Sequence, residues 1–229
     1  MKNQDAISVY LWTDFPDDDA DSFNRWYDEE HMPDRVMRIP GFTRGRRYVA
    51  VSGGPRYLAH YEMKDREVLV NEAYVEMRRN PDPTSRQFIP KFQNTRRSSA
   101  SARLEFGDGT GEFLAILGTI PGVARDEDMI SRLRPVLETI ATQPDIGNVR
   151  LMRTDTEAIE RSSKLMSGHA RSALREPERI CEWVVTVEGS DSETLSGVSS
   201  ELRAAIGEEN LEACAVMKLR LDIAPAESQ

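Results

Sequence analysis

The stretch that decides the fold is Tyr57-Leu-Ala-His-Tyr-Glu-Met-Lys-Asp-Arg-Glu-Val-Leu69, because it recurs later as Trp183-Val-Val-Thr-Val-Glu-Gly-Ser-Asp-Ser-Glu-Thr-Leu195. Both copies begin with an aromatic residue, continue with an apolar run and carry Glu, Asp, Glu and Leu at the same spacing. A second pair of segments, Pro40–Tyr48 and Pro144–Met152, aligns in the same order. Self-similarity of this kind indicates a duplication.

Around these segments each half predicts the same order of elements: strand, helix, two strands, helix and strand. In the first half we expect strands Ile7–Trp12, Phe42–Val51, Arg56–Met63 and Ala100–Phe106, with helices Asp18–Met37 and Asp65–Arg78. In the second half we expect strands Phe113–Ile120, Asn148–Arg153, Ile180–Glu188 and Ala213–Ile223, with helices Arg125–Thr142 and Ser192–Ile206. The pattern predicts an α+β protein of two tandem ferredoxin-like βαββαβ units, whose antiparallel sheets pack as an intramolecular α/β barrel.

Three glycines in Gly107-Asp-Gly-Thr-Gly111 predict the linker between the halves. We therefore expect an N-terminal half over residues 1–106, a linker over 107–111 and a C-terminal half over 112–229. The second half is longer between its second and third strands, which indicates an insertion at about residues 156–178. Its polar, serine-rich composition is helix-prone and typical of a mobile surface segment rather than a strand. We expect it to cover a pocket mouth, and we expect its deletion to change ligand affinity but hardly the melting temperature.

The overall charge excludes some classes of partner. The 30 Lys and Arg residues against 39 Asp and Glu give a formal net charge of −9, which repels nucleic acids and anionic membranes. No run approaches the roughly 20 apolar residues of a membrane span, and Met1–Phe15 lacks the apolar core of a secretion signal. Cys181 and Cys214 have neither metal-binding nor redox-pair spacing. We expect a cytoplasmic protein that binds a small-molecule substrate and assembles further as a homodimer.

Aromatic and titratable side chains share one face of the first predicted helix. At α-helical spacing this stripe contains Phe23, Trp26, Tyr27, Glu30, His31 and Asp34. Pro33 lacks an N–H and clashes with the carbonyl of Glu29, so we expect the helix to bend or restart beside His31. The stripe can hold a substrate and exchange protons with it. In a simpler interpretation the aromatic residues are core and His31 caps a free carbonyl.

The run Trp26-Tyr-Asp-Glu-Glu-His-Met-Pro33, with Ile39-Pro-Gly-Phe42 and Gly54-Pro-Arg-Tyr-Leu-Ala-His-Tyr61, resembles the EthD-like branch of the dimeric α/β-barrel (ferredoxin-like) superfamily. The resemblance covers about residues 5–105, and in the second half only the element order supports it. It implies that a helix-borne His before a Pro lines a pocket beside the sheet. Superfamily members include cofactor-free monooxygenases, polyketide cyclases, lactone isomerases and haem proteins. The helix Arg125–Thr142 has neither His nor aromatic residues, so we expect the second copy to be degenerate.

Three further residues are candidates for substrate binding. Arg44, Arg46 and Arg47 make the second strand basic, and Arg44 and Arg46 share a face where they can clamp a substrate carboxylate. Ion pairs with the acidic first helix, or plain solvation, are the alternative explanation of these arginines. His60 either meets the pocket or lines the barrel interior as a core histidine. The acidic run Asp17–Asp19 has a helix-dipole explanation, so we expect no metal site there.

The sequence therefore favours an enzyme that uses neither metal nor organic cofactor, acting on a small, apolar, oxygenated ring or keto compound. In this hypothesis His31 is the general acid/base, Glu30 or Asp34 orients it, and Tyr27 donates a hydrogen bond to a substrate oxygen. Trp26 and Phe23 form the apolar wall. The reaction is an isomerisation, cyclisation, lyase step or cofactor-free oxygenation. The alternatives are a non-catalytic ligand-binding or assembly protein, and a haem protein that uses His169.

Overall fold

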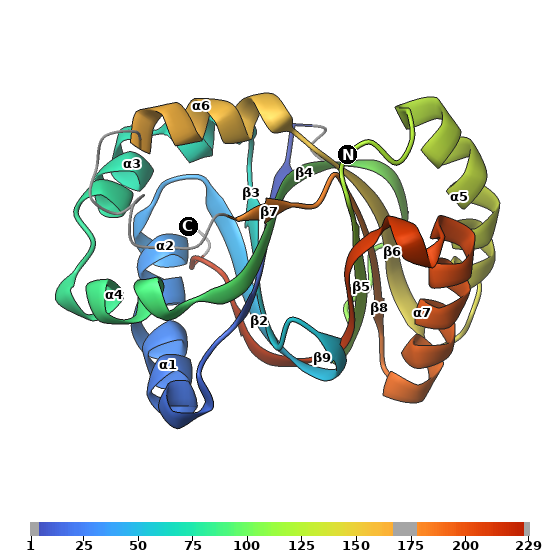
Figure 1. Ribbon diagram of the computed structural model, residues 1–229, viewed down its shortest axis with the longest axis horizontal. Coiled ribbons are helices and arrows are strands. Elements are labelled where there is room, and N and C mark those ends of the chain that lie inside the picture. The colour runs from blue at the N-terminus through green and yellow to red at the C-terminus, as the bar shows by residue number, and fades with distance from the viewer. Residues whose placement is uncertain (1–4, 167–177, 227–229) are drawn as a thin grey trace.

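Eight strands close into an antiparallel barrel in the computed structural model, which describes residues 5–166 and 178–226 (Figure 1). Around the barrel the order is β1 (Ile7–Asp14), β3 (Tyr57–Met63), β2 (Phe42–Gly54), β9 (Leu211–Ile223), β5 (Phe113–Thr119), β8 (Trp183–Gly189), β6 (Ile146–Thr154) and β4 (Gln93–Gly107). Pairing of β4 with β1 completes the circle. The short strand β7 (Arg179–Ile180) adds to β4 in parallel.

The two halves are copies of one unit, as the repeat predicts. In the first half β3 pairs with β1 and β2, and in the second half β8 pairs with β5 and β6. The repeated segments that begin at Tyr57 and Trp183 therefore occupy the same position in their sheets. The last strand of each unit is long and crosses to the other unit: β4 pairs with both β1 and β6, and β9 pairs with both β5 and β2. Hydrogen bonds thus join the two sheets edge to edge.

Helices cover the outer face of each sheet (Figure 1). The first unit has α1 (Ala20–Trp26), a π-helical turn (Tyr27–His31), α2 (Met32–Arg38), α3 (Glu72–Arg79) and α4 (Pro83–Phe88), with 3-10 turns at Asp17–Asp19, Arg66–Val70 and Ile89–Lys91. The second unit has α5 (Asp126–Ala141), α6 (Thr156–Met166), α7 (Ser192–Ile206) and a 3-10 turn at Glu208–Asn210. Two apolar cores lie between helices and sheets, and a third fills the barrel around Tyr10, Trp12 and Tyr48.

Three segments differ from the sequence-based expectation or extend it. Strand β4 begins at Gln93, seven residues before the expected start at Ala100. Between β4 and β5 the chain runs through the glycine-rich segment, where a Cβ atom at Gly111 would lie 2.2 Å from the carbonyl oxygen of Gly189. This close approach explains why glycine is needed there.

The insertion folds as a helix over residues 156–166, as its helix-prone composition predicts. Helix α6 lies beside α3 of the first unit, although it belongs to the second (Figure 1). Arg161 makes two hydrogen bonds to the carboxylate of Glu67, at 2.8 and 2.9 Å, and Ala158 is buried in the core of the first unit. Residues 167–177 lie outside the described residues.

Candidate functional site

A cavity of about 390 Å³ lies between the outer face of the first sheet and the helices that cover it. Its apolar wall consists of Val9, Leu11, Phe42, Met63, Ile89, Phe92 and Met166. Its polar and titratable lining consists of Tyr27, His31, Arg35, Tyr61, Tyr74, Arg78, Arg97, Ser163 and Glu178. The volume suits a small organic molecule, since ligand pockets span about 300–1,000 Å³.

The π-helical turn places the helix residues of this site. In a continuous α-helix of about 100° per residue, Met32 would lie roughly 180° from Phe23 and face solvent. Both residues are fully buried, because the wider turn at Tyr27–His31 shifts the following residues back toward the sheet. The Met32 N–H bonds the carbonyl of Tyr27, five residues earlier. π-Helical turns of this kind occur frequently at functional sites.

Contacts after the π-helical turn hold α2 against the sheet. Arg35 Nη1 donates to the carbonyl oxygen of His31 at 2.7 Å. Gly45 lets α2 approach β2, since a Cβ atom there would lie 2.6 Å from Val36 Cγ2. Proline alone does not explain the turn, because α5 contains Pro135 and stays α-helical. The expected break beside His31 is therefore present as a π-helical turn.

His31 and Tyr27 lie side by side on the cavity wall. Their ring centroids are 4.7 Å apart in an edge-on arrangement, and His31 is 6% exposed. Behind them, Tyr61 donates a hydrogen bond of 3.4 Å to the hydroxyl of Tyr27. Burial raises the pKa of Tyr61 well above its ordinary value, and the neighbouring Tyr27 adds to this shift. Tyr61 therefore stays a phenol and can orient the Tyr27 hydroxyl toward a ligand.

A buried arginine beneath the helix fixes Tyr27 from below. The guanidinium carbon of Arg47 lies 4.3 Å from the Tyr27 ring centroid. Arg47 Nη1 also pairs with Asp28 Oδ1 at 2.6 Å. Ion pairing with the acidic first helix is thus correct for Arg47, and this contact clamps the helix to β2.

The other residues of the predicted stripe lie elsewhere. Glu30 is exposed, and Asp34 is half-buried and pairs with Arg38 at 3.1 Å, so the expectation that they share a face with His31 is wrong. The π-helical turn changes the phase that α-helical spacing assumes. Trp26 and Phe23 are not among the described residues that line the cavity. Trp26 packs behind His31, with 4.2 Å between ring centroids, and Phe23 stacks on Phe15 in the core.

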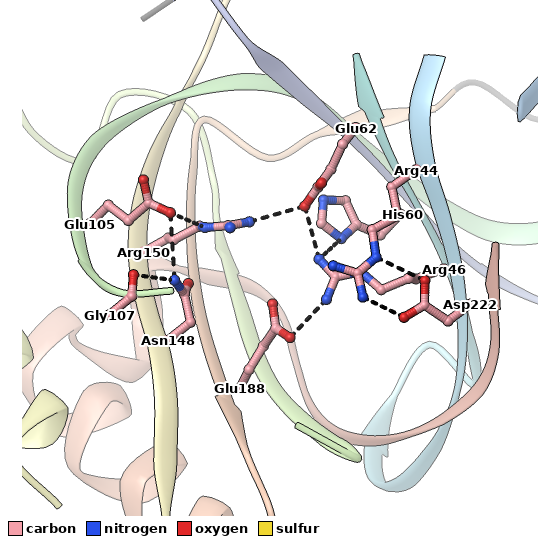
Figure 2. A network of polar contacts seen from close by, with 10 residues as sticks. All are labelled: Arg44, Arg46, His60, Glu62, Glu105, Gly107, Asn148, Arg150, Glu188 and Asp222. Atoms are coloured by element: carbon pink, nitrogen blue, oxygen red, sulfur yellow. Dashed lines mark hydrogen bonds and ion pairs between the residues drawn. The ribbon is translucent and has the colours of Figure 1, made fainter. Parts of the chain in front are cut away.

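The candidates on strands β2 and β3 face the barrel interior, on the opposite side of the sheet from the cavity. Figure 2 shows Arg44 paired with Asp222, and Arg46 paired with both Glu188 at 2.7 Å and Glu62 at 2.9 Å. The carboxylate clamp expected from Arg44 and Arg46 is therefore wrong, because carboxylates of the protein already occupy these groups. Strand alternation decides this outcome.

His60 lies in the same interior network and does not meet the cavity. Its Nδ1 lies 3.3 Å from Arg46 Nη2, and its ring stacks on Tyr10 with centroids 4.4 Å apart (Figure 2). Burial lowers the pKa of His60 well below its ordinary value, and the charges of Arg46, Arg150 and Arg44 act in the same direction. A neutral His60 accepts the hydrogen bond from Arg46. The alternative of a core histidine is the one that fits this environment.

Sequence reasoning missed the arginines that do line the cavity. Arg35 follows the π-helical turn, Arg78 lies on α3, and Arg97 lies in the part of β4 that precedes the expected strand Ala100–Phe106. Helix α6 contributes Ser163 and Met166 to the wall, as the expected pocket cover would. The sequence offered no signal for Arg97, because residues 93–99 are polar on both faces of the strand.

The described residues offer no metal centre and do not suit a haem in the second unit. Among residues 5–166 and 178–226 no cluster of three His, Cys, Asp or Glu side chains is arranged to bind a metal ion. The outer face of the second sheet is filled by buried Leu133, Leu137, Leu195 and Leu202. The chain has three histidines, and neither His31 nor His60 reaches that face. His169, the residue named for the haem hypothesis, lies outside the described residues.

Solved structures share the fold of this chain, whereas the sequence comparisons find no relative. No family model matches the chain, and no curated protein matches its sequence. Within the described part of the chain, no helix is long and apolar enough to cross a membrane. A solved anthrone oxidase-like protein is 10% identical, with a TM-score of 0.64 over 99% of this chain and 95% of the other.

Two further solved structures are similar over nearly their whole length. A protein named as a "putative monooxygenase" from Lactobacillus acidophilus NCFM is 10% identical, with a TM-score of 0.52 over 96% of both chains. A mutant chlorite dismutase from Candidatus Nitrospira defluvii is 8% identical, with a TM-score of 0.53 over 96% of this chain and 92% of the other. Identities this low show a shared fold and not a shared activity, and the EthD-like branch stays a prediction. The chain shares the fold of these proteins: two ferredoxin-like units in one polypeptide, whose antiparallel sheets form one barrel.

Proposed function

We propose that the chain is an enzyme that removes a proton from a small aromatic ketone or phenol, with His31 as the general base and Tyr27 as the hydrogen-bond donor to the substrate oxygen. The observation that carries this proposal is the placement of both rings, 4.7 Å apart, on the wall of one buried cavity. A base beside a donor is the minimum needed to form an enolate.

The walls of the cavity support an aromatic substrate. Phe42, Phe92 and Tyr74 supply ring faces, and Leu11 and Ile89 supply aliphatic contacts. A planar ring system can stack among these side chains, as aromatic pairs do in protein cores. Its oxygen then faces Tyr27, the polar group that Tyr61 already orients.

The proposed step is a proton transfer. The unprotonated imidazole nitrogen of His31 takes the proton from a C–H that is adjacent to the carbonyl or conjugated with it through an aromatic ring, and the electron pair moves to the carbonyl oxygen. The Tyr27 O–H donates to that oxygen as its negative charge develops. The enolate then takes up a proton at another carbon, which gives isomerisation, or reacts with O₂, which gives oxygenation.

Hydrogen exchange tests the proton transfer separately from the later steps. Anthrone and 2-tetralone both have an acidic methylene group, and anthrone is the type of compound that the name of the anthrone oxidase-like neighbour specifies. In D₂O under argon, the wild-type protein should accelerate deuterium uptake at this methylene group in at least one of the two ketones. His31→Gln should reduce the acceleration by about 10²–10⁴-fold, the usual contribution of a positioned acid/base.

The same samples separate an enzyme from a binding protein. If the protein changes the absorbance spectra of both ketones but their deuterium uptake is no faster than in buffer alone, it binds them without catalysis. Equal exchange rates for wild type and His31→Gln refute the role of His31. Admission of air then shows whether anthrone is converted to anthraquinone and water with consumption of one O₂.

A further inference from the structure

Three arginines converge on the cavity from separate elements. Arg35 comes from α2, Arg78 from α3 and Arg97 from β4. Arg35 is 8% exposed and Arg97 is 9% exposed. Burying guanidinium groups in an apolar cavity is unfavourable unless anions neutralise them.

Within residues 5–166 and 178–226, few carboxylates lie close to this cluster. Glu178 is the single carboxylate among the described residues that line the cavity, and its Oε2 lies 3.6 Å from Arg97 Nη1. Arg97 Nε is buried without a hydrogen-bond partner in the described part of the protein. Among the residues that the structure describes, no carboxylate lies within ion-pair distance of Arg35, whose Nη1 donates to the His31 carbonyl.

The third arginine adds positive charge to the same place. Arg78 Nη1 donates to Ser162 Oγ of α6 at 2.6 Å. Burial lowers the pKa of Arg78, and the charges of Arg97 and Arg35 lower it further. The three side chains are therefore close enough to repel one another, and a bound anion would relieve that repulsion.

The barrel interior shows how this chain treats other buried arginines. Arg46 pairs with Glu188 and Glu62, and Arg150 pairs with Glu62 and Glu105 (Figure 2). Arg46 and Arg150 thus each meet two carboxylates of the protein. Among the described residues, Arg97 meets one carboxylate and Arg35 meets none, and both side chains line the cavity.

We propose that Arg35 and Arg97, with Arg78 beside them, bind a carboxylate group of the ligand, so that the natural substrate is an aromatic keto acid or phenolic acid. This substrate class rests on the proposed function, since that proposal places the aromatic ring and the oxygen against Tyr27 and His31. Arginine forks bind carboxylates through paired, charge-assisted hydrogen bonds. The arginine side chains also explain how a protein with a net negative charge can bind an acidic ligand, because they concentrate positive charge inside the cavity.

Two ligands of matched shape test the proposal by binding alone, with no reaction taking place. Neither 2-naphthoate nor 2-naphthamide has an acidic methylene group, and they differ in charge at one substituent. Isothermal titration calorimetry on the wild-type protein should show naphthoate binding at least about tenfold more tightly than naphthamide. Loss of a charge-assisted hydrogen bond corresponds to about 10- to 100-fold in affinity. Arg97→Gln and Arg35→Gln should each weaken naphthoate by that factor and change naphthamide by less than about threefold.

Arg96→Gln is the matched control. It removes the same charge from the next residue of β4, where Arg96 pairs with Glu212 at 3.1 Å and is not among the residues that line the cavity. Its naphthoate affinity should stay within about twofold of wild type. If one arginine variant fails to fold, the ligand pair on wild type and the other variant still decide the question.

Several results overturn the carboxylate site. These are equal affinities for naphthoate and naphthamide, no detectable naphthoate binding, or an Arg96→Gln effect as large as that of Arg97→Gln. Failure of the proposed function looks different: naphthoate binds with the expected preference, but no ketone exchanges its hydrogens faster with wild type than with His31→Gln.

Discussion

Replacing His60 by Asn should change how the stability of the protein depends on pH. His60 is 3% exposed, stacks on Tyr10 and accepts a hydrogen bond from Arg46, and its pKa lies well below its ordinary value of 6.5. The folded protein therefore keeps this imidazole neutral, whereas the unfolded chain protonates it below about pH 6.5. The unfolded state binds more protons, so stability is lost as the pH falls.

The size of the effect follows from the proton uptake of the unfolded chain. With an unfolded pKa of 6.5 and no uptake in the folded state, the loss is about 0.8 kcal/mol at pH 6 and about 2 kcal/mol at pH 5. His60→Asn does not titrate and keeps an acceptor oxygen near the position of Nδ1. The variant is less stable at pH 8 because it loses the stacked ring, but this disadvantage should shrink by about 2 kcal/mol at pH 5.

Urea unfolding of both proteins at half-unit steps between pH 5 and pH 8 measures the difference directly. Titrations of all other groups are common to both proteins and cancel in the difference. Parallel curves would refute the neutral His60. A disadvantage that grows in acid would mean that His60 is protonated in the folded state and pairs with Glu62.

Three further predictions concern the cavity. His31→Phe keeps the ring contacts with Trp26 and Tyr27. Its free energy of unfolding should therefore stay within about 1.5 kcal/mol of wild type. The acceleration of deuterium uptake by the ketones should fall by about 10²–10⁴-fold. Stability of this variant is measured by thermal unfolding, and a large loss with unchanged exchange would assign His31 to the core. Met166→Ala should cost about 2 kcal/mol and alter naphthoate affinity, because Met166 is buried and lines the cavity; Arg161→Gln, which removes an exposed ion pair of the same helix, should cost less than about 1 kcal/mol. Glu30→Gln should leave exchange within about twofold of wild type, and a loss comparable to that of His31→Gln would restore Glu30 to the site.

The fold could be predicted from the sequence because its signals are local and repeated. The strands that begin at Tyr57 and Trp183 each have an apolar run of their own, and two copies in the same order reinforce one another. The start of β4 had no such signal. Its residues Thr95, Arg97 and Ser99 are polar and yet buried. Arg97 lines the cavity, and the Thr95 hydroxyl lies within hydrogen-bond distance of the Thr13 hydroxyl.

The site was harder to predict because it depends on one irregular turn. Periodicity places Glu30 with His31 and turns Met32 outward, whereas the structure does the opposite. The sequence marks the irregularity with Pro33, but the same residue type at Pro135 leaves α5 regular. Contacts between distant strands, such as Arg44 with Asp222, decide which arginines pair within the protein and which face the cavity. No local pattern contains that information.

The position of α6 shows what fusion of two units permits. A symmetric pair of identical subunits would have to carry every insertion twice, and each copy would cover its partner in the same way. In this chain the segment encoded by the second unit covers the cavity of the first, and the second sheet face is filled with aliphatic side chains instead. One repeat is thus free to specialise in holding a ligand while the other evolves as its cover and support. Substitutions in α6, about 130 residues away in sequence from His31, should therefore be able to alter substrate choice without touching the reacting groups.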